Sequence, residues 1–287
     1  MAQQANSMAT WLALFERADI PVMRQTARSL ERLRDDQGQV NASSIAGVVT
    51  DDPLMTVKLL RYMQNHKRSS QAYELVDVKQ MLLMMGVETF FRVLPAQPVV
   101  EETLRGHMDA LVCLFQTVRR AQRAADYAFD WALRLHDLHA QEVLVSALLS
   151  HVTEMLMWCF NPEQMLDIRK RQLADKTLRS ADVQTEVMGF TGVELQRRLT
   201  LDWHLPELLQ NLMDPALAHT PRVRNVTLAV NLARHSASGW DNAALPDDYT
   251  AIGALLRMEP ARVAALVGGD EAVAAARKRS PPDDAST

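Results

Sequence analysis

The sequence predicts an all-α protein in which an N-terminal helical bundle packs on a second helical lobe. Apolar residues recur at helical spacing along most of the chain, and almost no segment shows the alternation of a β-strand. Helix starts are marked repeatedly by a capping residue followed by proline. With 287 residues, of which 48% are hydrophobic, the chain is long enough to bury a substantial core.

Composition argues against several classes of protein. Lys and Arg total 31 against 35 Asp and Glu, so the chain lacks the basic surface of a protein that binds nucleic acid or an anionic membrane. No stretch approaches the roughly 20 apolar residues of a membrane span, and the start of the chain does not resemble a signal peptide. Cys113 and Cys159 stand singly in apolar patterns, which predicts buried thiols in a reducing compartment. We therefore expect a soluble cytoplasmic protein, with nucleic acid a disfavoured partner.

Residues 20–96 are predicted to form the N-terminal lobe, after an extension at residues 1–19. Ala27, Leu30 and Leu33 recur at helical spacing and predict its first helix. The following helices begin at capping residues and end at residues that stop a helix. The start signals are Asn41, Asp52-Pro53, and Asp77 with Gln80. The end signals are Asn65-His66, Gly86 and Pro95.

The second lobe is predicted to span residues 107–265 and to join the first near residues 96–106. One long helix should run from His107 to about Leu135, where a row of alanines implies close helix packing. After a break at residues 137–139, apolar residues continue at helical spacing and place His151 on an inward stripe. Further helices should restart at Asn161-Pro162, Leu205-Pro206 and Thr220-Pro221. Residues 278–287 are polar and Pro-rich and are predicted to be a disordered tail.

Several short motifs, each weak alone, occur in a fixed order along the chain. They are Ile20-Pro21, Asp51-Asp52-Pro53-Leu54, Lys58-Leu59-Leu60-Arg61 with Asn65, Met85-Gly86-Val87, Trp203-His204-Leu205-Pro206-Glu207 and Val230-Asn231-Leu232-Ala233-Arg234. Their order and spacing resemble the HDOD family, whose members are relatives of the HD-type metal-dependent phosphohydrolases. The resemblance covers residues 20–265, and similarity to the catalytic relatives is confined to the second half.

The resemblance implies where the metal ligands of a catalytic relative would fall. The first His falls near Arg120, the adjacent His and Asp fall at Ser150 and His151, the later His falls near Met213-Asp214, and the final Asp falls at Arg234. A cation in place of a carboxylate repels a metal, and serine is a poor substitute for imidazole. We therefore expect a degenerate site with no metal, no cofactor and no catalytic activity. Its cleft would contain Arg120, Ser150, His151, Glu154, Asp214 and Arg234.

Two other interpretations of these residues stay open. His136 with His139, and His151 with Glu154, have metal-like spacing, although no set of three or four ligands converges in the sequence. Arg234 and His151 would suit an anion in the former metal site, whereas pairing of Arg234 with a carboxylate such as Glu154 would neutralise it. Neighbouring arginines, among them Arg123, Arg222 and Arg224, either surround that cleft or are solvated and ion-paired.

Three functional classes remain after this comparison. The resemblance favours a non-enzymatic bacterial signalling module that binds other signalling proteins, such as cyclic-dinucleotide turnover proteins, response regulators or kinases. The alternatives are a small-molecule sensor that binds a nucleotide or anion in the metal-free cleft, and a residual phosphohydrolase. For the first class, the partner surface is predicted where an apolar helix ends in a polar loop. Its residues are Arg61, Asn65, His66, Lys67 and Arg68.

Overall fold

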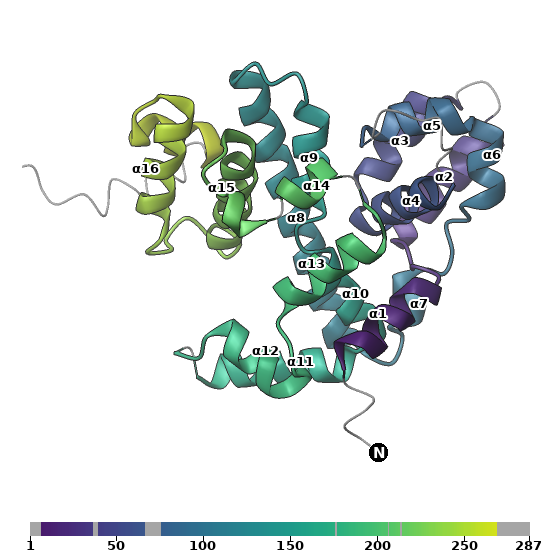
Figure 1. Cartoon of the computed structure of the whole chain (residues 1–287), viewed down its shortest axis with the longest axis horizontal. Helices are drawn as coiled ribbons and strands as arrows, with labels where there is room; N and C mark the ends of the chain where they lie inside the picture. Colours follow the sequence, from purple (N-terminus) through teal and green to yellow (C-terminus); the bar gives the residue numbers. More distant parts are fainter. Residues whose placement is uncertain are drawn as a thin grey trace, which may run out of the picture.

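A computed structural model describes residues 7–36, 40–66, 76–175, 177–205, 207–212 and 214–268 and has an all-α fold (Figure 1). In these ranges the regular structure is α-helical, apart from a 3-10 turn, η2 (Pro215–Leu217), and one isolated parallel β-bridge between Val22 and Val99. The predicted fold class is therefore confirmed. The predicted tail at residues 278–287 lies outside the described residues.

The N-terminal lobe is a bundle of short helices, of which α3, α4 and α5 begin at the predicted capping residues. Asn41 and Ser44 form a capping box at the start of α3, and Asp52 with Pro53 starts α4. The backbone amide of Val22 donates to the carbonyl of Pro98, and the amide of Val100 donates to the carbonyl of Val22. These two hydrogen bonds join the beginning of the bundle to its end. The helices are α2 (Arg24–Asp35), α3 (Ala42–Thr50), α4 (Pro53–Asn65), α5 (Val78–Met85), α6 (Val87–Val93) and α7 (Val100–Thr103).

The second lobe is built around one long central helix, α8 (Met108–Arg134), as predicted. Its alanines at positions 121, 124, 125 and 128 are buried, which lets α9 and α15 pack closely against it. The other helices are α9 (Ala140–Leu148), α10 (Val152–Phe160), α11 (Pro162–Ala174), α12 (Ser180–Met188), α13 (Gly192–Asp202), α14 (Glu207–Leu212), α15 (Pro221–His235) and α16 (Leu245–Leu256). Residues 260–268 are also helical.

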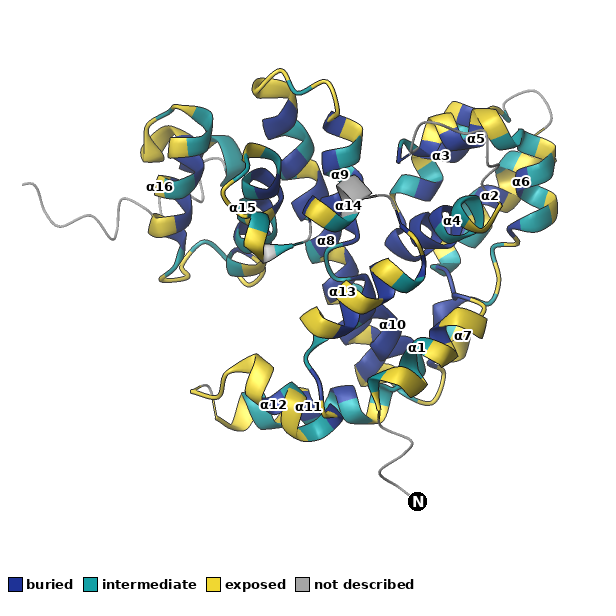
Figure 2. Cartoon of the chain, in the orientation of Figure 1, coloured by how far each residue is buried: buried dark blue, intermediate teal, exposed yellow. Residues whose placement is uncertain are grey.

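The two lobes meet along α4, which packs against α8 and α10. The first helix, α1 (Met8–Arg17), crosses to the second lobe and packs on α13 (Figure 1). Phe15 of α1 is buried and its ring lies 5.9 Å from that of Phe160. Most of the predicted extension at residues 1–19 is therefore a helix that takes part in the core, and Figure 2 shows the buried face continuing through α4, α8 and α10.

His151 does not lie within a continuous helix, which corrects the prediction of an uninterrupted inward stripe. The chain turns at residues 149–151, between α9 and α10, and His151 is the residue before α10. The periodic pattern did not reveal this break because the apolar residues keep their spacing across a single turn.

The stretch of residues 140–160 is long enough and apolar enough to resemble a membrane span by length and composition. In the structure 72% of the most apolar window of this stretch is buried inside the protein. Such burial is typical of the core helix of a soluble protein.

Candidate functional site

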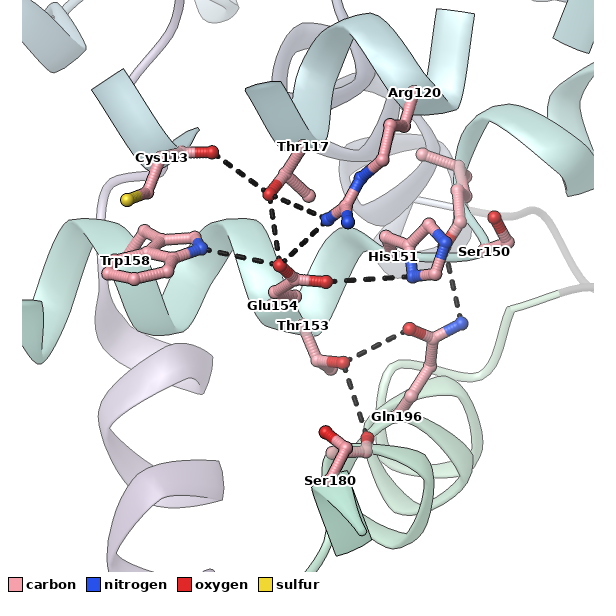
Figure 3. A network of polar contacts seen from close by, with 12 residues as sticks. Cys113, Thr117, Arg120, Ser150, His151, Thr153, Glu154, Trp158, Ser180 and Gln196 are labelled. Atoms are coloured by element: carbon pink, nitrogen blue, oxygen red, sulfur yellow. Dashed lines mark hydrogen bonds and ion pairs between the residues drawn. The ribbon is translucent and has the colours of Figure 1, made fainter. Parts of the chain in front are cut away.

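Glu154 lies at the centre of a polar cluster between α8 and α10 (Figure 3). Its Oε1 accepts hydrogen bonds from Nη2 of Arg120 at 3.0 Å and from Nε1 of Trp158 at 3.4 Å. The hydroxyl of Thr117 lies 3.0 Å from the same oxygen, and Oε2 of Glu154 lies 3.7 Å from Nδ1 of His151. We call these four residues and His151 the Glu154 cluster: Thr117, Arg120, His151, Glu154 and Trp158.

The electrostatics of the cluster set the charge of each member at neutral pH. Burial lowers the pKa of His151, and the charges of Arg120 and Arg234 lower it further, against the opposing effect of Glu154. Burial alone would raise the pKa of Glu154, but His151, Arg120 and the hydrogen bonds from Thr117 and Trp158 hold it below its ordinary value. Glu154 is therefore ionised and His151 neutral at pH 7.

Among the described residues no ion pair joins Arg234 to Glu154, whose carboxylate is bound by Arg120. The Nη2 atom of Arg234 instead lies 3.3 Å from Oδ1 of Asn231 and 3.1 Å from Nε2 of His235. Its side chain is exposed, yet its charge acts on His151. Two guanidinium groups, one carboxylate and a neutral imidazole leave one surplus positive charge here.

The other predicted cleft residues have partners elsewhere. The hydroxyl of Ser150 donates to the carbonyl of Ala147 at 2.7 Å. Asp214 lies 3.9 Å from Arg197 and accepts a hydrogen bond from the backbone of Ala216, so no contact joins it to the Glu154 cluster within the described residues. Of the six predicted residues, the structure thus brings together Arg120, His151 and Glu154, with Arg234 close enough to influence His151.

The additional arginines and histidines are also engaged away from the cluster. Arg222 forms a bidentate pair with Asp137 at 2.8 and 2.9 Å, and His139 lies 3.1 Å from Glu142. Arg123 donates to Ser236 and Tyr127, and Arg224 donates to Ala251. Within the described ranges, no three side chains of His, Cys, Asp or Glu converge as a metal ion would require.

The predicted partner surface is divided by the structure. Arg61 is an internal contact rather than a free surface cation, because its guanidinium donates to the carbonyls of Phe15 and Ala18 and lies 5.2 Å from the ring of Trp203. Asn65 and His66 are exposed at the end of α4, and the ring of His66 stacks on Tyr62 at 4.0 Å. Lys67 and Arg68 lie outside the described residues.

A second polar cluster, on α4, was not predicted as a unit. Lys58 is buried, and its Nζ lies 2.6 Å from Oδ1 of Asp19 and 2.7 Å from the carbonyl of Gln97. Asp52 is 1% exposed and accepts backbone hydrogen bonds from Met23, Leu54 and Met55. The available signal was the occurrence of Asp52, Lys58 and Arg61 on one strongly apolar helix, where a charged residue must find a partner. We call these three residues the α4 cluster.

His235 and Asp248 were also missed. Nδ1 of His235 lies 2.6 Å from Oδ2 of Asp248, and both side chains are largely buried. They belong to different helices, α15 and α16, and no short-range pattern links them.

Comparison with known proteins gives a consistent result. A family model described as HDOD domain matches residues 20–219. The crystal structure of the MmoQ response regulator from Methylococcus capsulatus str. Bath is 17% identical, has a TM-score of 0.63, and is matched over 88% of this chain and 99% of that one. The crystal structure of a virulence factor from Campylobacter jejuni subsp. jejuni is 16% identical and has a TM-score of 0.64. It is matched over 93% of this chain and 98% of that one. At these identities the likeness shows a shared fold. A search of curated proteins found no match.

Proposed function

The chain belongs to the HDOD domain family, and from this premise we propose that it is a non-enzymatic bacterial signalling module that acts in the cytoplasm by binding other proteins. The family match and the fold shared with a response regulator support a role in signal transduction. The partner class we propose is another signalling protein, such as a cyclic-dinucleotide turnover protein, a response regulator or a kinase.

One observation carries the non-enzymatic part of this proposal. Where the family resemblance places the first metal-binding His, Arg120 instead binds the carboxylate of Glu154 at 3.0 Å. A guanidinium cannot act as a metal ligand, and it also engages the carboxylate beside it. His151 is left with one carboxylate neighbour, which is too few donors for a divalent ion that activates water.

The test of this part is elemental analysis of the purified chain together with phosphomonoesterase and phosphodiesterase assays in added Mn²⁺, Mg²⁺ or Zn²⁺. We expect no stoichiometric metal and no hydrolysis beyond that of a His151→Ala, Glu154→Gln double variant. Bound metal that is lost in His151→Ala, or hydrolysis that the double variant abolishes, would overturn the proposal.

The test of protein binding is quantitative capture from lysate of the native organism followed by measurement of the affinity for each captured protein. Reversing charge at Lys67 and Arg68 should weaken capture of the partner. The matched control is charge reversal at Arg169 and Lys170, two adjacent exposed cations on α11. Equal capture by the two double variants would exclude the end of α4 as the partner surface.

A second candidate function, anion sensing, is favoured by a specific feature of the Glu154 cluster. The cluster carries one surplus positive charge when Arg234 is included, and Nε of Arg120 is buried with no hydrogen-bond partner in the described structure. An oxyanion such as a phosphate or carboxylate group would supply the missing acceptor and the missing negative charge.

Inorganic phosphate is the probe for this second function. If the cluster binds it, the melting temperature of the protein should rise with the logarithm of the phosphate concentration. Arg234→Ala should abolish that rise. Arg119→Ala, which removes the exposed arginine next to Arg120 on α8, should leave the rise intact. No shift at millimolar phosphate in the wild type would exclude anion sensing by phosphate.

A further inference from the structure

Arg234, His235 and Asp248 form a chain of polar contacts from α16 to Arg234, whose charge acts on His151 of the Glu154 cluster. The Nη2 atom of Arg234 lies 3.1 Å from Nε2 of His235, and Nδ1 of His235 lies 2.6 Å from Oδ2 of Asp248. The side chains of His235 and Asp248 are 20% and 10% exposed. All three residues follow residue 219, where the family match ends.

Donor and acceptor chemistry determines the tautomer of His235. A guanidinium can only donate hydrogen bonds, so Nε2 of His235 must present its lone pair to Arg234. The ring proton then resides on Nδ1 and is donated to the carboxylate of Asp248. A carboxylate that orients a histidine in this way also fixes which ring nitrogen accepts.

The position of Arg234 therefore depends on a residue of a different helix. The guanidinium is held by His235 and Asn231, and it forms no ion pair within the described part of the chain. The other charged groups near the ring of His235 are Asp248 on α16 and Arg123 on α8, which donates to the carbonyl of the adjacent Ser236. Loss of the acceptor at Nε2 would leave the exposed side chain of Arg234 held by Asn231 alone, so its guanidinium could move away from the Glu154 cluster.

We propose that Asp248 and His235 are positioning residues that hold Arg234 beside the Glu154 cluster, so that α16 controls the second cation of the oxyanion site. The ligand class is a phosphate or carboxylate group, and this part of the inference rests on the anion-sensing function proposed above. The placement of Arg234 does not rest on it. The competing account is that His235 and Asp248 only tie α15 to α16.

The pKa of His151, measured by NMR titration, reports the position of Arg234 without any ligand. Arg234→Ala should raise that pKa, because one nearby cation is removed. We call the contacts from Asp248 through His235 to Arg234 the relay. Asp248→Asn should raise the pKa of His151 as well if breaking this relay releases Arg234. The direct effect of deleting a negative charge has the opposite sign, since it would lower the pKa of His151. The control is Asp247→Asn, the same change at the exposed neighbouring residue of α16, which isolates that direct effect.

His235→Asn separates positioning from a structural tie. The shorter amide can still donate to Asp248, but it lacks an acceptor at the place of Nε2. A raised pKa of His151 in this variant, with circular dichroism showing a folded protein, would support the relay even if Asp248→Asn failed to fold. An unchanged or lowered pKa of His151 in folded His235→Asn would overturn it.

Phosphate binding gives the second measurement. Where the wild type binds inorganic phosphate, Asp248→Asn and His235→Asn should weaken binding roughly three- to tenfold, as expected when a charged hydrogen-bond donor is less well placed, whereas Asp247→Asn should not. If the wild type binds no phosphate, the proposed sensing function fails while the titration of His151 still decides the relay. Phosphate binding that Asp248→Asn and His235→Asn both leave unchanged would also overturn the relay.

Discussion

The α4 cluster and the Glu154 cluster contain similar residue types but differ in what their charges bind. In the α4 cluster, Asp52 accepts from backbone amides, and Lys58 and Arg61 donate to backbone carbonyls of segments far away in the sequence. In the Glu154 cluster, the carboxylate is held by side chains of α8 and α10. The contacts of the α4 cluster tie distant backbone segments to α4. The side-chain contacts of the Glu154 carboxylate can be broken without leaving a backbone group unpaired. We therefore propose that the α4 cluster serves folding and that the Glu154 cluster serves function.

The largest effect is expected at Asp52, which caps α4 and also binds the amide of Met23 just before α2. Asp52→Ala should reduce the free energy of unfolding by about 3 kcal/mol, because it removes a cap and leaves buried amides without acceptors. Asp77→Ala, which removes only the cap at Gln80 of α5, should cost about 1 kcal/mol. Urea unfolding followed by circular dichroism measures both. Similar losses in the two variants would contradict a role for Asp52 beyond capping.

Lys58→Met should have the next largest effect, a loss of about 2 kcal/mol. The variant keeps the buried alkyl chain but leaves the carbonyls of Ile20 and Gln97 without the ammonium donor. Asp19 is 61% exposed and can be rehydrated, so it adds little to the loss. Lys79→Met, at an exposed position of α5, is the control and should stay within about 0.5 kcal/mol of the wild type. A stable Lys58→Met variant would show that α4 does not need this donor.

Glu154→Gln should cost only about 1 kcal/mol, because the carboxylate is 33% exposed and solvent can compensate part of the lost pairing with Arg120. If the assignment of the two clusters is right, this variant changes anion or partner binding more than it changes folding. Comparing its phosphate response with its unfolding curve tests the distinction. A loss of stability as large as that of Asp52→Ala would make the Glu154 cluster structural as well.

The smallest effect concerns the pH dependence of stability. The pKa of His151 is lowered in the folded protein, so the unfolded chain binds more protons as the pH falls below the ordinary value of 6.5. His151 therefore makes the folded state less stable on mild acidification. Glu154, whose folded pKa is also lowered, stabilises above its ordinary value of 4.5 and loses that contribution only as the pH falls further, through its folded pKa.

His151→Asn should accordingly lose less stability than the wild type between pH 7 and pH 5. His66→Asn, at the exposed histidine that follows α4, is the matched control for removing one imidazole. Unfolding measured across this pH interval gives the comparison. A pH dependence unchanged in His151→Asn would mean that the folded protein does not hold the pKa of His151 below its ordinary value.

Part of the candidate site followed from the sequence and part did not. The family resemblance placed Arg120, His151 and Arg234 in one region, and the structure brings Arg120 and His151 around Glu154. It also placed Asp214 there, but Asp214 lies near Arg197 instead. The break between α9 and α10 escaped the periodic pattern, and His235 with Asp248 left no pattern at all. Each failure concerns a contact between helices or the path of the chain between them.

By itself, the sequence determined the all-α class and several helix starts, such as Asn41 for α3, Asp52-Pro53 for α4 and Thr220-Pro221 for α15. These signals are readable because a cap or a proline acts on amides and dihedral angles within about four residues of itself. Only the tertiary structure decided that Arg61 binds α1 and Trp203, and that Arg234 is held by a histidine oriented from α16. The partner of a charged side chain is set by distance in space, and helix packing brings together residues that no local pattern connects.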